Sequence, residues 1–536
     1  MSSELPVQEY TEAQKRELQN LLSRGFQAIS KGDLKTAAES AQAALDVDRE
    51  LPQAHFLVGL IGLASNDRAT AFKAFQSVVS IDKDHAAAWA HLAKLFMTEG
   101  QVNRADAALK EARRIKSSDP NVLDLMGTTL SLMGEYDVAR AFFTKAVELQ
   151  PKHLPFMMNL ANNLVYHGDK EASGKLFIDA LRQQPDNAQA HWALATSRKA
   201  TDDSQLEVMR GFEKRYEGNP RAEAFVYYAM GKICEDLERW DEAIDAFQKG
   251  ADARRKTVEY NEQAEIEMFD FLKEVFTEDW VNEGEQGVDD NSPIFVLGQP
   301  RTGTTLIERI ITSHSSVHSA GELQQFGLAL RRLSGYSNPV RFSAELFNRA
   351  SMLNYEQVGG MYLQTTSRMR GTTPRFVDKL PQNYLMIPMI LKALPNAKIV
   401  HLVRNPMDAC FASFKQLFAD AYLHSYHQEE MARHHARYRD LMQTWRERFP
   451  GRFFDISYED TARDLEPNAR ALIDFLELPW EDACLEFHKQ KTAVSTASAS
   501  QVREPVHTRS IDRWRRYEEK LQPMREMLKK SGVTLE

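Results

Sequence analysis

Small residues recur at a fixed spacing through the first part of this chain, and this period constrains the fold more than any other feature of the sequence. Five positions that stand 34 residues apart hold glycine or asparagine, and they are Gly32, Asn66, Gly100, Gly134 and Gly168. Alanine keeps the same phase at Ala37, Ala71, Ala105 and Ala139. Small residues allow two helices to cross closely, and a glycine or asparagine can end a helix in a left-handed conformation. The pattern therefore predicts a stack of helical hairpins.

The period of 34 residues is typical of the tetratricopeptide repeat, so the front of the chain is predicted to form an α-helical superhelix. We expect this array over residues 18–255, with one degenerate unit after Ala195, where the phase weakens. Arrays of this kind commonly bind peptides or other proteins on their concave face. Residues 256–291 are predicted to be a helical connection and a linker, because Gly284, Gly287 and Asp289 lie near its end.

A glycine-containing loop follows the linker. Residues 294–297 are apolar, Gly298 and Gly303 enclose a short loop, and residues 306–311 have a helical pattern. A strand that runs into a helix through such a loop presents backbone N–H groups and the positive end of the helix dipole to an anion. An ATP- or GTP-binding loop would have lysine where this chain has Thr304, and Arg301 supplies the positive charge instead. The segment predicts a phosphate-binding loop, and the alternative is a surface turn that joins a core strand to a core helix.

The rest of the chain alternates between strands and helices. Strands are predicted at residues 293–298, 375–378, 397–403 and 452–456, with helical stretches between them. This alternation indicates an α/β domain with a mostly parallel sheet, over residues 292–536. The phosphate loop would then lie at the carboxyl end of the first strand, where open sheets of this class bind ligands. We expect residues 292–536 to bind a nucleotide without the repeats.

Four short motifs occur in this domain, at residues 300–305, 378–383, 403–406 and 501–506. Together they resemble the sulfotransferases that use 3′-phosphoadenylyl sulfate. The resemblance is strongest to the tyrosylprotein sulfotransferase-like branch, whose bacterial members carry an N-terminal tetratricopeptide array. It implies a P-loop-like sulfotransferase domain that transfers a sulfuryl group to a hydroxyl of a protein, glycan or small molecule.

The resemblance also implies which residues bind the donor. Arg404 would bind the 3′-phosphate, while the 5′-phosphosulfate would lie against the loop residues Pro300, Arg301, Thr302, Gly303, Thr304 and Thr305. The family has a serine eight residues after this arginine, but this chain has Ala412 there. Either Ser413 replaces that serine or the contact is missing. The remaining predicted donor contacts are Tyr458, Ser498 and Arg503.

Sulfuryl transfer needs a base for the acceptor proton and positive charge near the leaving phosphate, and it needs no metal. Glu322 is the predicted base, because the helix after the phosphate loop returns the chain to the same rim of the sheet. By the resemblance, Lys379 would stabilise the sulfuryl oxygens and the leaving group. His314 and His318 are alternative bases, because histidine titrates near neutral pH. Their spacing of four resembles a pair of metal ligands, but no further ligands accompany it and we expect no metal.

Composition limits the partners of the chain. Lys and Arg number 67 against 76 Asp and Glu, and the net charge of −9 favours neither nucleic acid nor an anionic membrane surface. The three cysteines lie far apart, as expected for buried free thiols in a reducing compartment. No apolar run approaches the roughly 18 residues of a membrane span, and no secretory signal is visible, so we predict a cytoplasmic protein.

Two other functions remain open at this point. A repeat scaffold with an inactive nucleotide-binding domain would explain Ala412 and the single acid at Glu322, where the family has two. A P-loop kinase or NTPase is less favoured, because the loop lacks lysine and no strand ends in an evident aspartate for Mg²⁺. The sequence leaves the acceptor and the oligomeric state undetermined.

Overall fold

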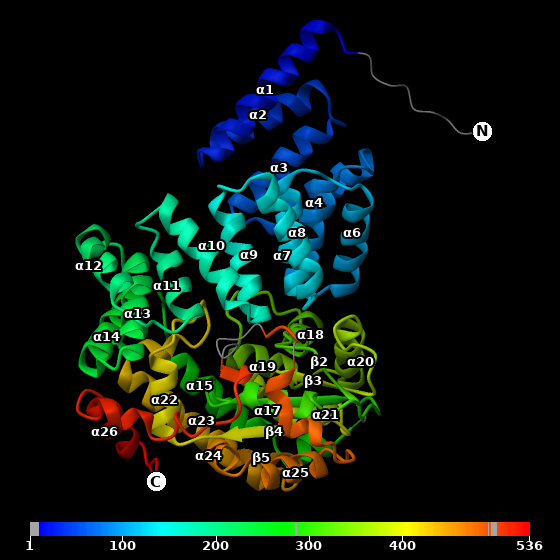
Figure 1. Cartoon of the computed structure of the whole chain (residues 1–536). Coiled ribbons are helices and arrows are strands. Elements are labelled where there is room, and N and C mark those ends of the chain that lie inside the picture. The colour runs from blue at the N-terminus through cyan, green and yellow to red at the C-terminus, as the bar shows by residue number, and fades with distance from the viewer. Residues whose placement is uncertain (1–9, 285–286, 491, 495–500, 536) are drawn as a thin grey trace. The chain divides into compact units, whose positions relative to one another are not determined.

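The chain folds into two compact units, Met1–Pro151 and Lys152–Glu536. The computed structural model describes residues 10–284, 287–490, 492–494 and 501–535 (Figure 1). Unit 1 and unit 2 are the names used below for these two parts.

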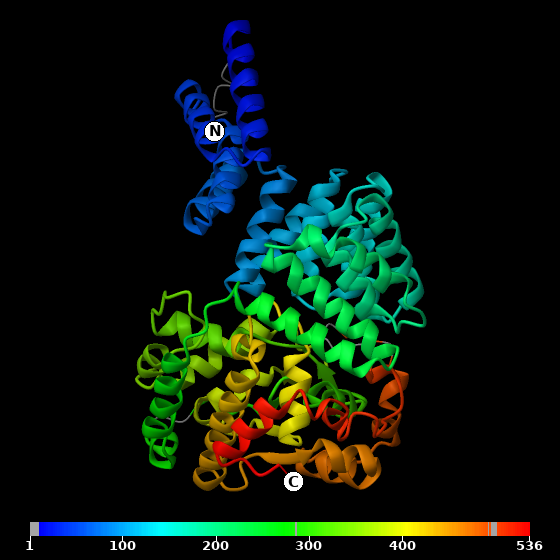
Figure 2. The same cartoon turned by 90° about the vertical axis from the view of Figure 1, so that its left-hand side faces the viewer.

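Unit 1 consists of helices that pack side by side in consecutive pairs (Figures 1 and 2). They are α1 (Glu12–Ser30), α2 (Leu34–Val47), α3 (Pro52–Ala64), α4 (Arg68–Ile81), α5 (Ala86–Thr98), α6 (Val102–Arg114), α7 (Pro120–Leu132) and α8 (Tyr136–Leu149). The turn between paired helices holds the periodic glycine or asparagine with a positive φ, for example 76° at Gly32 and 59° at Asn66. The predicted left-handed helix ends are therefore confirmed.

A second periodic glycine lets the paired helices approach each other. A Cβ atom added at Gly59 in α3 would lie 2.5 Å from the ring of Phe75 in α4, and one at Gly127 in α7 would lie 2.7 Å from the ring of Phe143 in α8. A side chain at either position would collide with a buried ring. The absence of a side chain thus explains the fixed phase of these small residues.

Unit 2 begins with further repeat helices. They are α9 (Leu154–His167), α10 (Lys170–Gln183), α11 (Ala188–Ser197), α12 (Ser204–Tyr216), α13 (Pro220–Asp236) and α14 (Trp240–Arg255), followed by the connecting helices α15 (Glu262–Val275) and α16 (Glu278–Asn282). Gly231 in α13 has the same relation to Phe247 in α14 as Gly59 has to Phe75, with a distance of 2.6 Å. Repeat geometry thus continues into unit 2, and the fold class predicted from the period is confirmed.

The sheet of unit 2 has five parallel strands in the order β2-β3-β1-β4-β5. The strands are β1 (Pro293–Gly298), β2 (Val317–Ser319), β3 (Arg375–Lys379), β4 (Lys398–Val403) and β5 (Phe454–Ser457). Four of them match the predicted strands closely, whereas β2 was not predicted. Every residue of β1 is buried, as expected for the central strand of a sheet covered on both faces.

Helices cover this sheet and connect its strands (Figure 1). They are α17 (Thr304–Thr312), α18 (Gln325–Leu333), α19 (Ala344–Ala350), α20 (Tyr355–Thr366), η1 (Pro381–Met386), α21 (Ile387–Ala393), α22 (Pro406–Phe414), η2 (Leu423–Tyr426), α23 (Gln428–Arg448), α24 (Tyr458–Arg463), α25 (Leu465–Phe475), η3 (Asp482–Lys489), η4 (Gln501–Arg503), η5 (Arg513–Tyr517) and α26 (Gln522–Lys530).

One hydrophobic core joins the last repeat helices to the covering helices of the sheet. Its buried members come from α11–α14, α22, α23, η5 and α26, and they include Tyr228, Phe247, Met407, Phe411, Tyr517 and Met524. Figure 1 shows α14, α22 and α26 gathered on one side of unit 2. The hydroxyl of Tyr228 also donates to the carbonyl of Phe414 at 3.0 Å. The later repeats therefore pack as part of the same body as the sheet.

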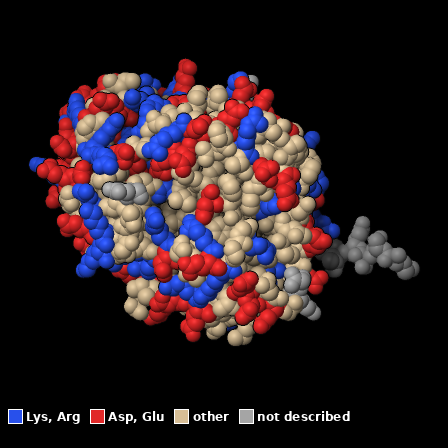
Figure 3. Space-filling view, turned by 90° about the horizontal axis from the view of Figure 1, so that it is seen from below, with Lys and Arg blue, Asp and Glu red and all other residues tan. Residues whose placement is uncertain are grey.

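Two predictions from composition can be compared with the structure. Cys234, Cys410 and Cys484 are free and buried, as predicted. In the described part of the chain, no helix is both long enough and apolar enough to cross a membrane. The face in Figure 3 carries Lys and Arg side chains interspersed with Asp and Glu.

Candidate donor and sulfuryl-transfer site

The loop between β1 and α17 has its carbonyl groups fixed by the surrounding protein. Three successive carbonyl oxygens accept hydrogen bonds, and the pairs are Thr302 Oγ1 to Gln299 O (2.7 Å), Ser413 Oγ to Pro300 O (3.2 Å) and Arg404 Nη1 to Arg301 O (2.7 Å). Arg301 and Gly303 have left-handed φ values of 65° and 109°. Carbonyls held on one side, with a backbone that changes hand, turn neighbouring N–H groups to the other side and form an anion-binding concavity. Helix α17 starts at the end of this loop, and its dipole adds positive potential there.

Two arginines place fixed charge at the loop. Burial and the neighbouring Arg404 lower the pKa of Arg301 to about 10, so the guanidinium stays charged at neutral pH. The Arg404 guanidinium lies over the ring of Tyr458, 4.6 Å from its centroid, and donates to Ser510 O at 2.7 Å. Tyr458 also packs on the loop, because a Cβ atom at Gly303 would lie 2.6 Å from its ring. The structure therefore brings these predicted donor residues together.

A small cavity of about 60 Å³ lies directly beside this loop. Its walls include Gly303, Thr305, Tyr458, Phe487, Pro505 and Ser510. The segment that carries the last predicted motif thus passes next to the phosphate loop, although the two are about 200 residues apart in the sequence.

Lys379 and Glu322 form an ion pair at the rim of the sheet. The Lys379 side chain is 1% exposed and the Glu322 side chain is 44% exposed, so the carboxylate faces solvent while the ammonium group is enclosed. The backbone N–H of Lys379 donates to Gly321 O at 2.9 Å, which fixes the turn that carries Glu322. The two residues proposed for catalysis from the sequence are therefore direct neighbours.

Glu308 was missed in the sequence. It lies in α17, is 5% exposed, and accepts a hydrogen bond from Ser319 Oγ at 2.6 Å. Burial raises its pKa, although the nearby Lys379 acts in the opposite direction. The available signal was a charged residue in an otherwise apolar helix, one turn after Thr304.

The other three predicted donor residues, Ser413, Arg503 and Ser498, differ in their relation to the loop. Ser413 is fully buried and its hydroxyl is bonded to the loop, as described above. Arg503 Nη2 donates to Tyr166 O at 2.8 Å, at the end of repeat helix α9, so its guanidinium faces the repeats in this structure. Ser498 lies outside the described residues. Donor roles for all three remain predictions.

The two alternative bases differ in burial. His314 is 1% exposed, and its Nε2 hydrogen-bonds to Pro479 O at 2.8 Å while its Nδ1 accepts from the N–H of Ser316 at 3.1 Å. Both of its ring nitrogens are therefore used to hold a turn. His318 lies in β2, packs near Gly371, and has its pKa lowered by burial.

Glu235 was also missed, and it comes from repeat helix α13. Its buried carboxylate accepts hydrogen bonds from Lys415 Nζ at 2.7 Å and Tyr517 OH at 2.9 Å, and pairs with Arg513 Nη2 at 3.1 Å. Burial acts to raise its pKa, but Lys415 and Arg513 lower it to about 2. Burial in turn lowers the pKa of Lys415 to about 8. Arg301 of the loop feels the charge of this carboxylate, so a repeat helix contributes to the electrostatics of the loop.

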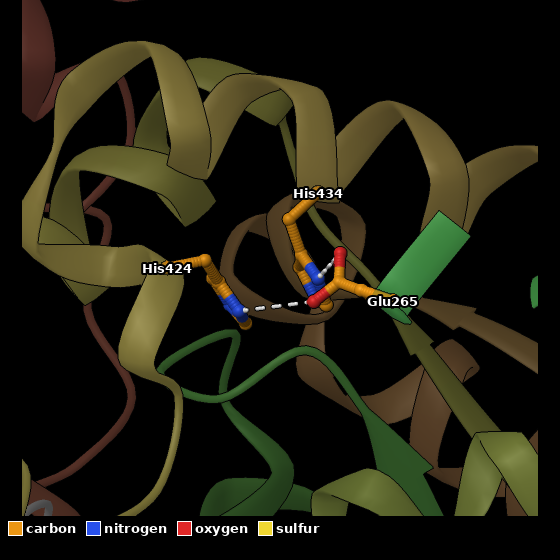
Figure 4. A group of neighbouring side chains, drawn as sticks. All are labelled: Glu265, His424 and His434. Atoms are coloured by element: carbon orange, nitrogen blue, oxygen red, sulfur yellow. Dashed lines mark hydrogen bonds and ion pairs between the residues drawn. The ribbon is translucent and has the colours of Figure 1, made fainter. Parts of the chain in front are cut away.

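A cluster of Glu265, His424 and His434 has the composition of a metal site (Figure 4). Its two imidazole rings are stacked, with centroids 3.4 Å apart and planes 12° apart. A ring nitrogen binds a metal with a lone pair that lies in the ring plane, so two parallel rings cannot both point at one ion. Arg437 Nη2 already donates to Glu265 Oε1 at 2.8 Å. As placed, the cluster is a hydrogen-bonded network.

A larger cavity of about 720 Å³ opens at the amino edge of the sheet. Asp290, Arg375, Lys398 and Glu477 are among its lining residues, and Lys398 Nζ lies 2.6 Å from Glu477 Oε1. Open α/β sheets bind their ligands at the carboxyl ends of the strands. The loop at the opposite edge is therefore the better site for a donor.

Comparison with known proteins gives the class of this fold and site. Residues 293–482 match the family model described as sulfotransferase family, and residues 62–128, 120–153 and 158–198 match tetratricopeptide repeat models. Residues 293–482 therefore resemble sulfotransferase-family domains, and they follow segments that match tetratricopeptide repeats.

Three of the proteins to which the chain is similar are an uncharacterized protein, a putative sulfotransferase and a solved sulfotransferase domain. An uncharacterized protein of Aquifex aeolicus is 29% identical over 446 residues, which cover 81% of this chain and 58% of that protein. A putative protein-tyrosine sulfotransferase of Caenorhabditis briggsae is 24% identical over 231 residues, which cover 41% of this chain and 80% of that protein. Among solved structures, the sulfotransferase domain from the curacin biosynthetic pathway is 16% identical with a TM-score of 0.32, and the match covers 47% of this chain and 100% of that domain.

Proposed function

We propose that the chain transfers a sulfuryl group from 3′-phosphoadenylyl sulfate to a hydroxyl of an acceptor. The observation that carries the proposal is the contact between Arg404 and the carbonyl of Arg301, at 2.7 Å. It puts a second fixed cation beside a phosphate loop that has no lysine. Two separate guanidinium groups suit a nucleotide with phosphates at two positions, because each can make charge-assisted bonds to its own phosphate.

The Lys379 and Glu322 pair supplies the groups that the reaction requires. Glu322 would accept the proton of the acceptor hydroxyl as its oxygen forms a bond to sulfur. The bond between sulfur and the 5′-phosphate oxygen breaks, and adenosine 3′,5′-bisphosphate leaves with that electron pair. Lys379 would balance the negative charge on the leaving phosphate and sulfuryl oxygens. No metal takes part in this scheme.

We further propose that the repeats recruit the acceptor or a partner protein, since such arrays commonly bind peptides. An acceptor with a tyrosine side chain fits the relative named as a putative protein-tyrosine sulfotransferase, and a glycan or a small molecule would present the same nucleophile. The free buried cysteines suit a reducing compartment, and we place the enzyme in the cytoplasm.

The donor is tested by comparing adenosine 3′,5′-bisphosphate with ADP and ATP in calorimetric titrations. We expect the bisphosphate to bind more tightly than ADP, and Arg404→Ala to remove this preference by deleting a contact of about 1.5–3 kcal/mol. Arg470→Ala, which changes an exposed arginine paired with Glu466, is the matched control. Equal affinity of the wild type for the bisphosphate and ADP would contradict the donor assignment, and magnesium-dependent ATP turnover would favour a kinase or NTPase.

Catalysis is tested separately with Glu322→Gln. We expect normal bisphosphate binding and a loss of about 10²–10⁴ in turnover of sulfate from the donor, because the base is removed while its size is kept. Lys379→Ala should lose turnover and donor affinity together, since its charge acts before and during transfer. Near-normal turnover of Glu322→Gln with an inactive His318→Ala would transfer the role of base to the histidine. Tight bisphosphate binding without any transfer would favour an inactive nucleotide-binding scaffold.

A further inference from the structure

Gln299 links the central strand to the phosphate loop. It follows the last residue of β1, precedes Pro300, and is 1% exposed. Its carbonyl accepts the hydroxyl of Thr302 across the loop at 2.7 Å. Its side-chain amide reaches His434, and its backbone N–H faces the hydroxyl of Tyr438. Each of these groups leads to a chain of polar side chains, which ends at part-buried Glu265 in one case and at exposed Asp455 in the other.

The first chain starts at the side chain of Gln299. Its Nε2 lies 3.3 Å from His434 Nε2 in α23, and His434 Nδ1 lies 2.9 Å from Glu265 Oε1 in α15. The hydroxyl of Tyr384 also reaches His434 Nε2, at 3.4 Å. Arg437 holds the far end by donating to Glu265 (Figure 4 shows the Glu265 and His434 contact). This chain runs from the loop to the connecting helix.

The second chain includes the hydroxyl of Tyr438, whose pKa is raised by burial while the backbone N–H of Gln299 acts to lower it. That hydroxyl lies 2.5 Å from His401 Nε2 in β4, and His401 Nδ1 lies 2.5 Å from Asp455 Oδ1 in β5. Arg446 Nε closes this chain by donating to Asp455 Oδ2 at 2.6 Å. Burial acts to raise the pKa of Asp455, but the bonds from His401 and Arg446 lower it to about 2.

Both chains impose the same proton arrangement. In each, histidine Nδ1 faces a carboxylate and must carry the proton, while Nε2 faces N–H or O–H groups and must accept. The donors therefore all point from Gln299 toward a carboxylate that an arginine holds in place. Hydrogen bonds aligned in one direction polarise one another, so each chain favours one arrangement of its members.

We propose that Gln299 is a positioning residue, and that the two chains ending in Glu265 and Asp455 fix it so that the next residues adopt the anion-binding form of the loop. Glu265, His434, His401, Tyr438 and Asp455 then act on the donor through Gln299, without touching it. A change in donor affinity tests this proposal only if the proposed function is correct. A change in the order of the loop can be measured in the unliganded protein and does not depend on the proposed function.

Tyr438→Phe removes the hydroxyl that contacts His401 and faces the Gln299 N–H, and it keeps the ring. We expect amide hydrogen exchange to rise in peptides that cover residues 296–305, and the Kd for adenosine 3′,5′-bisphosphate to rise by about tenfold. The matched control is Tyr355→Phe in α20, which removes another buried hydroxyl, one that donates to Ala350 O in α19 at 3.1 Å. The control should leave both readouts at the wild-type level. Unchanged exchange in the loop of Tyr438→Phe would overturn the proposal, whether or not the wild type binds the nucleotide.

The side-chain contact is tested with two replacements of His434. An asparagine side chain is too short to reach the Nε2 position, so His434→Asn should keep a donor toward Glu265 and lose the acceptor for Gln299. His434→Gln places an amide oxygen near the Nε2 position and should restore loop protection and most of the nucleotide affinity. Rescue by glutamine and failure of asparagine, at equal melting temperatures, is the expected result. Equal behaviour of the two variants would show that His434 acts through packing alone and would contradict the proposal.

Discussion

The repeat helices of unit 1 and those of unit 2 have the same internal geometry and different surroundings. Gly59 against Phe75 in unit 1 and Gly231 against Phe247 in unit 2 are the same close crossing of paired helices. In unit 1 the helices bury their apolar faces against neighbouring hairpins. In unit 2, helices α11–α14 also share a core with α22, α23, η5 and α26 of the α/β part of the unit.

This difference shows what a repeat period predicts. The period describes contacts inside a hairpin and between adjacent hairpins. It contains no information on what the outer surface of the last hairpin covers. Glu235 is in a helix that reads as an ordinary repeat, and it pairs with Lys415 and Arg513. The expected functional boundary at 291 and the packing boundary at 151 are therefore different properties of the chain.

The largest effect is expected from cutting the chain between these two boundaries. A chain of residues 287–536 would expose the buried faces that now contact α11–α14, and each large side chain uncovered costs about 1.5–3 kcal/mol. The sum exceeds the roughly 5–15 kcal/mol that stabilises a typical domain. We expect this fragment to aggregate or to lack a cooperative melting transition, whereas residues 152–536 should melt cooperatively and bind the bisphosphate. If the fragment of residues 287–536 folds and binds the nucleotide, the α/β part does not need the repeats, as the sequence led us to expect.

A smaller effect is expected from Glu235→Gln. The change leaves Lys415 and Arg513 buried without their carboxylate, and breaking a buried pair costs about 3–5 kcal/mol. Tryptophan fluorescence during denaturant unfolding follows unit 2, because only Trp89 of the seven tryptophans lies in unit 1. Glu207→Gln, which changes an exposed carboxylate paired with Arg210, is the control.

The same variant has a defined pH dependence. The pKa of Glu235 falls from an ordinary 4.5 to about 2 in the folded protein, so its contribution is complete above pH 4.5 and is lost as the pH falls toward 2. The wild type should therefore lose its advantage over Glu235→Gln across this range. A constant difference in unfolding free energy from pH 7 to pH 2 would contradict the ion-pair explanation.

The smallest effect is expected from alanine at two equivalent helix crossings, one in unit 1 and one in unit 2. Gly59→Ala and Gly231→Ala each place a methyl group against a buried ring, at 2.5 and 2.6 Å, and overpacking of this kind costs about 1–3 kcal/mol. Gly231→Ala should lower the melting temperature of the fluorescence transition and weaken bisphosphate binding near that temperature. Gly59→Ala should leave both unchanged and destabilise unit 1 alone, as measured by proteolysis of residues 12–149. Equal effects on nucleotide binding would show that the two sets of repeats are coupled in the same way.

Much of the fold could be predicted, because the signals are local. The 34-residue phase indicated the hairpins, and apolar runs with flanking turns indicated β1, β3, β4 and β5. Strand β2 has only three residues, and its sequence of Val317, His318 and Ser319 carries no strand pattern. It forms because β3 offers a free edge, which is a tertiary effect.

The site was predictable where a motif or the expected course of the chain marked it. The loop at 300–305 and Lys379 came from motifs, and Glu322 came from the expected return of the chain to the same rim; the structure brings Lys379 and Glu322 into contact. Glu235 and the chains behind Gln299 could not be found this way, since their members come from helices and strands far apart in the sequence. A buried polar residue is recognised by its partners, and the partners are known only after folding.

The shared core has a consequence for how such chains can vary. Hairpins that contact only other hairpins can be gained or lost as whole units, because each interface resembles the next. Helices α11–α14 cannot be exchanged in this manner, since Glu235 and Tyr228 bond to Lys415 and Phe414, which lie outside the repeats. Homologous chains should accordingly differ in the number of repeats that precede residue 152, and should keep the length between α11 and the sheet nearly constant.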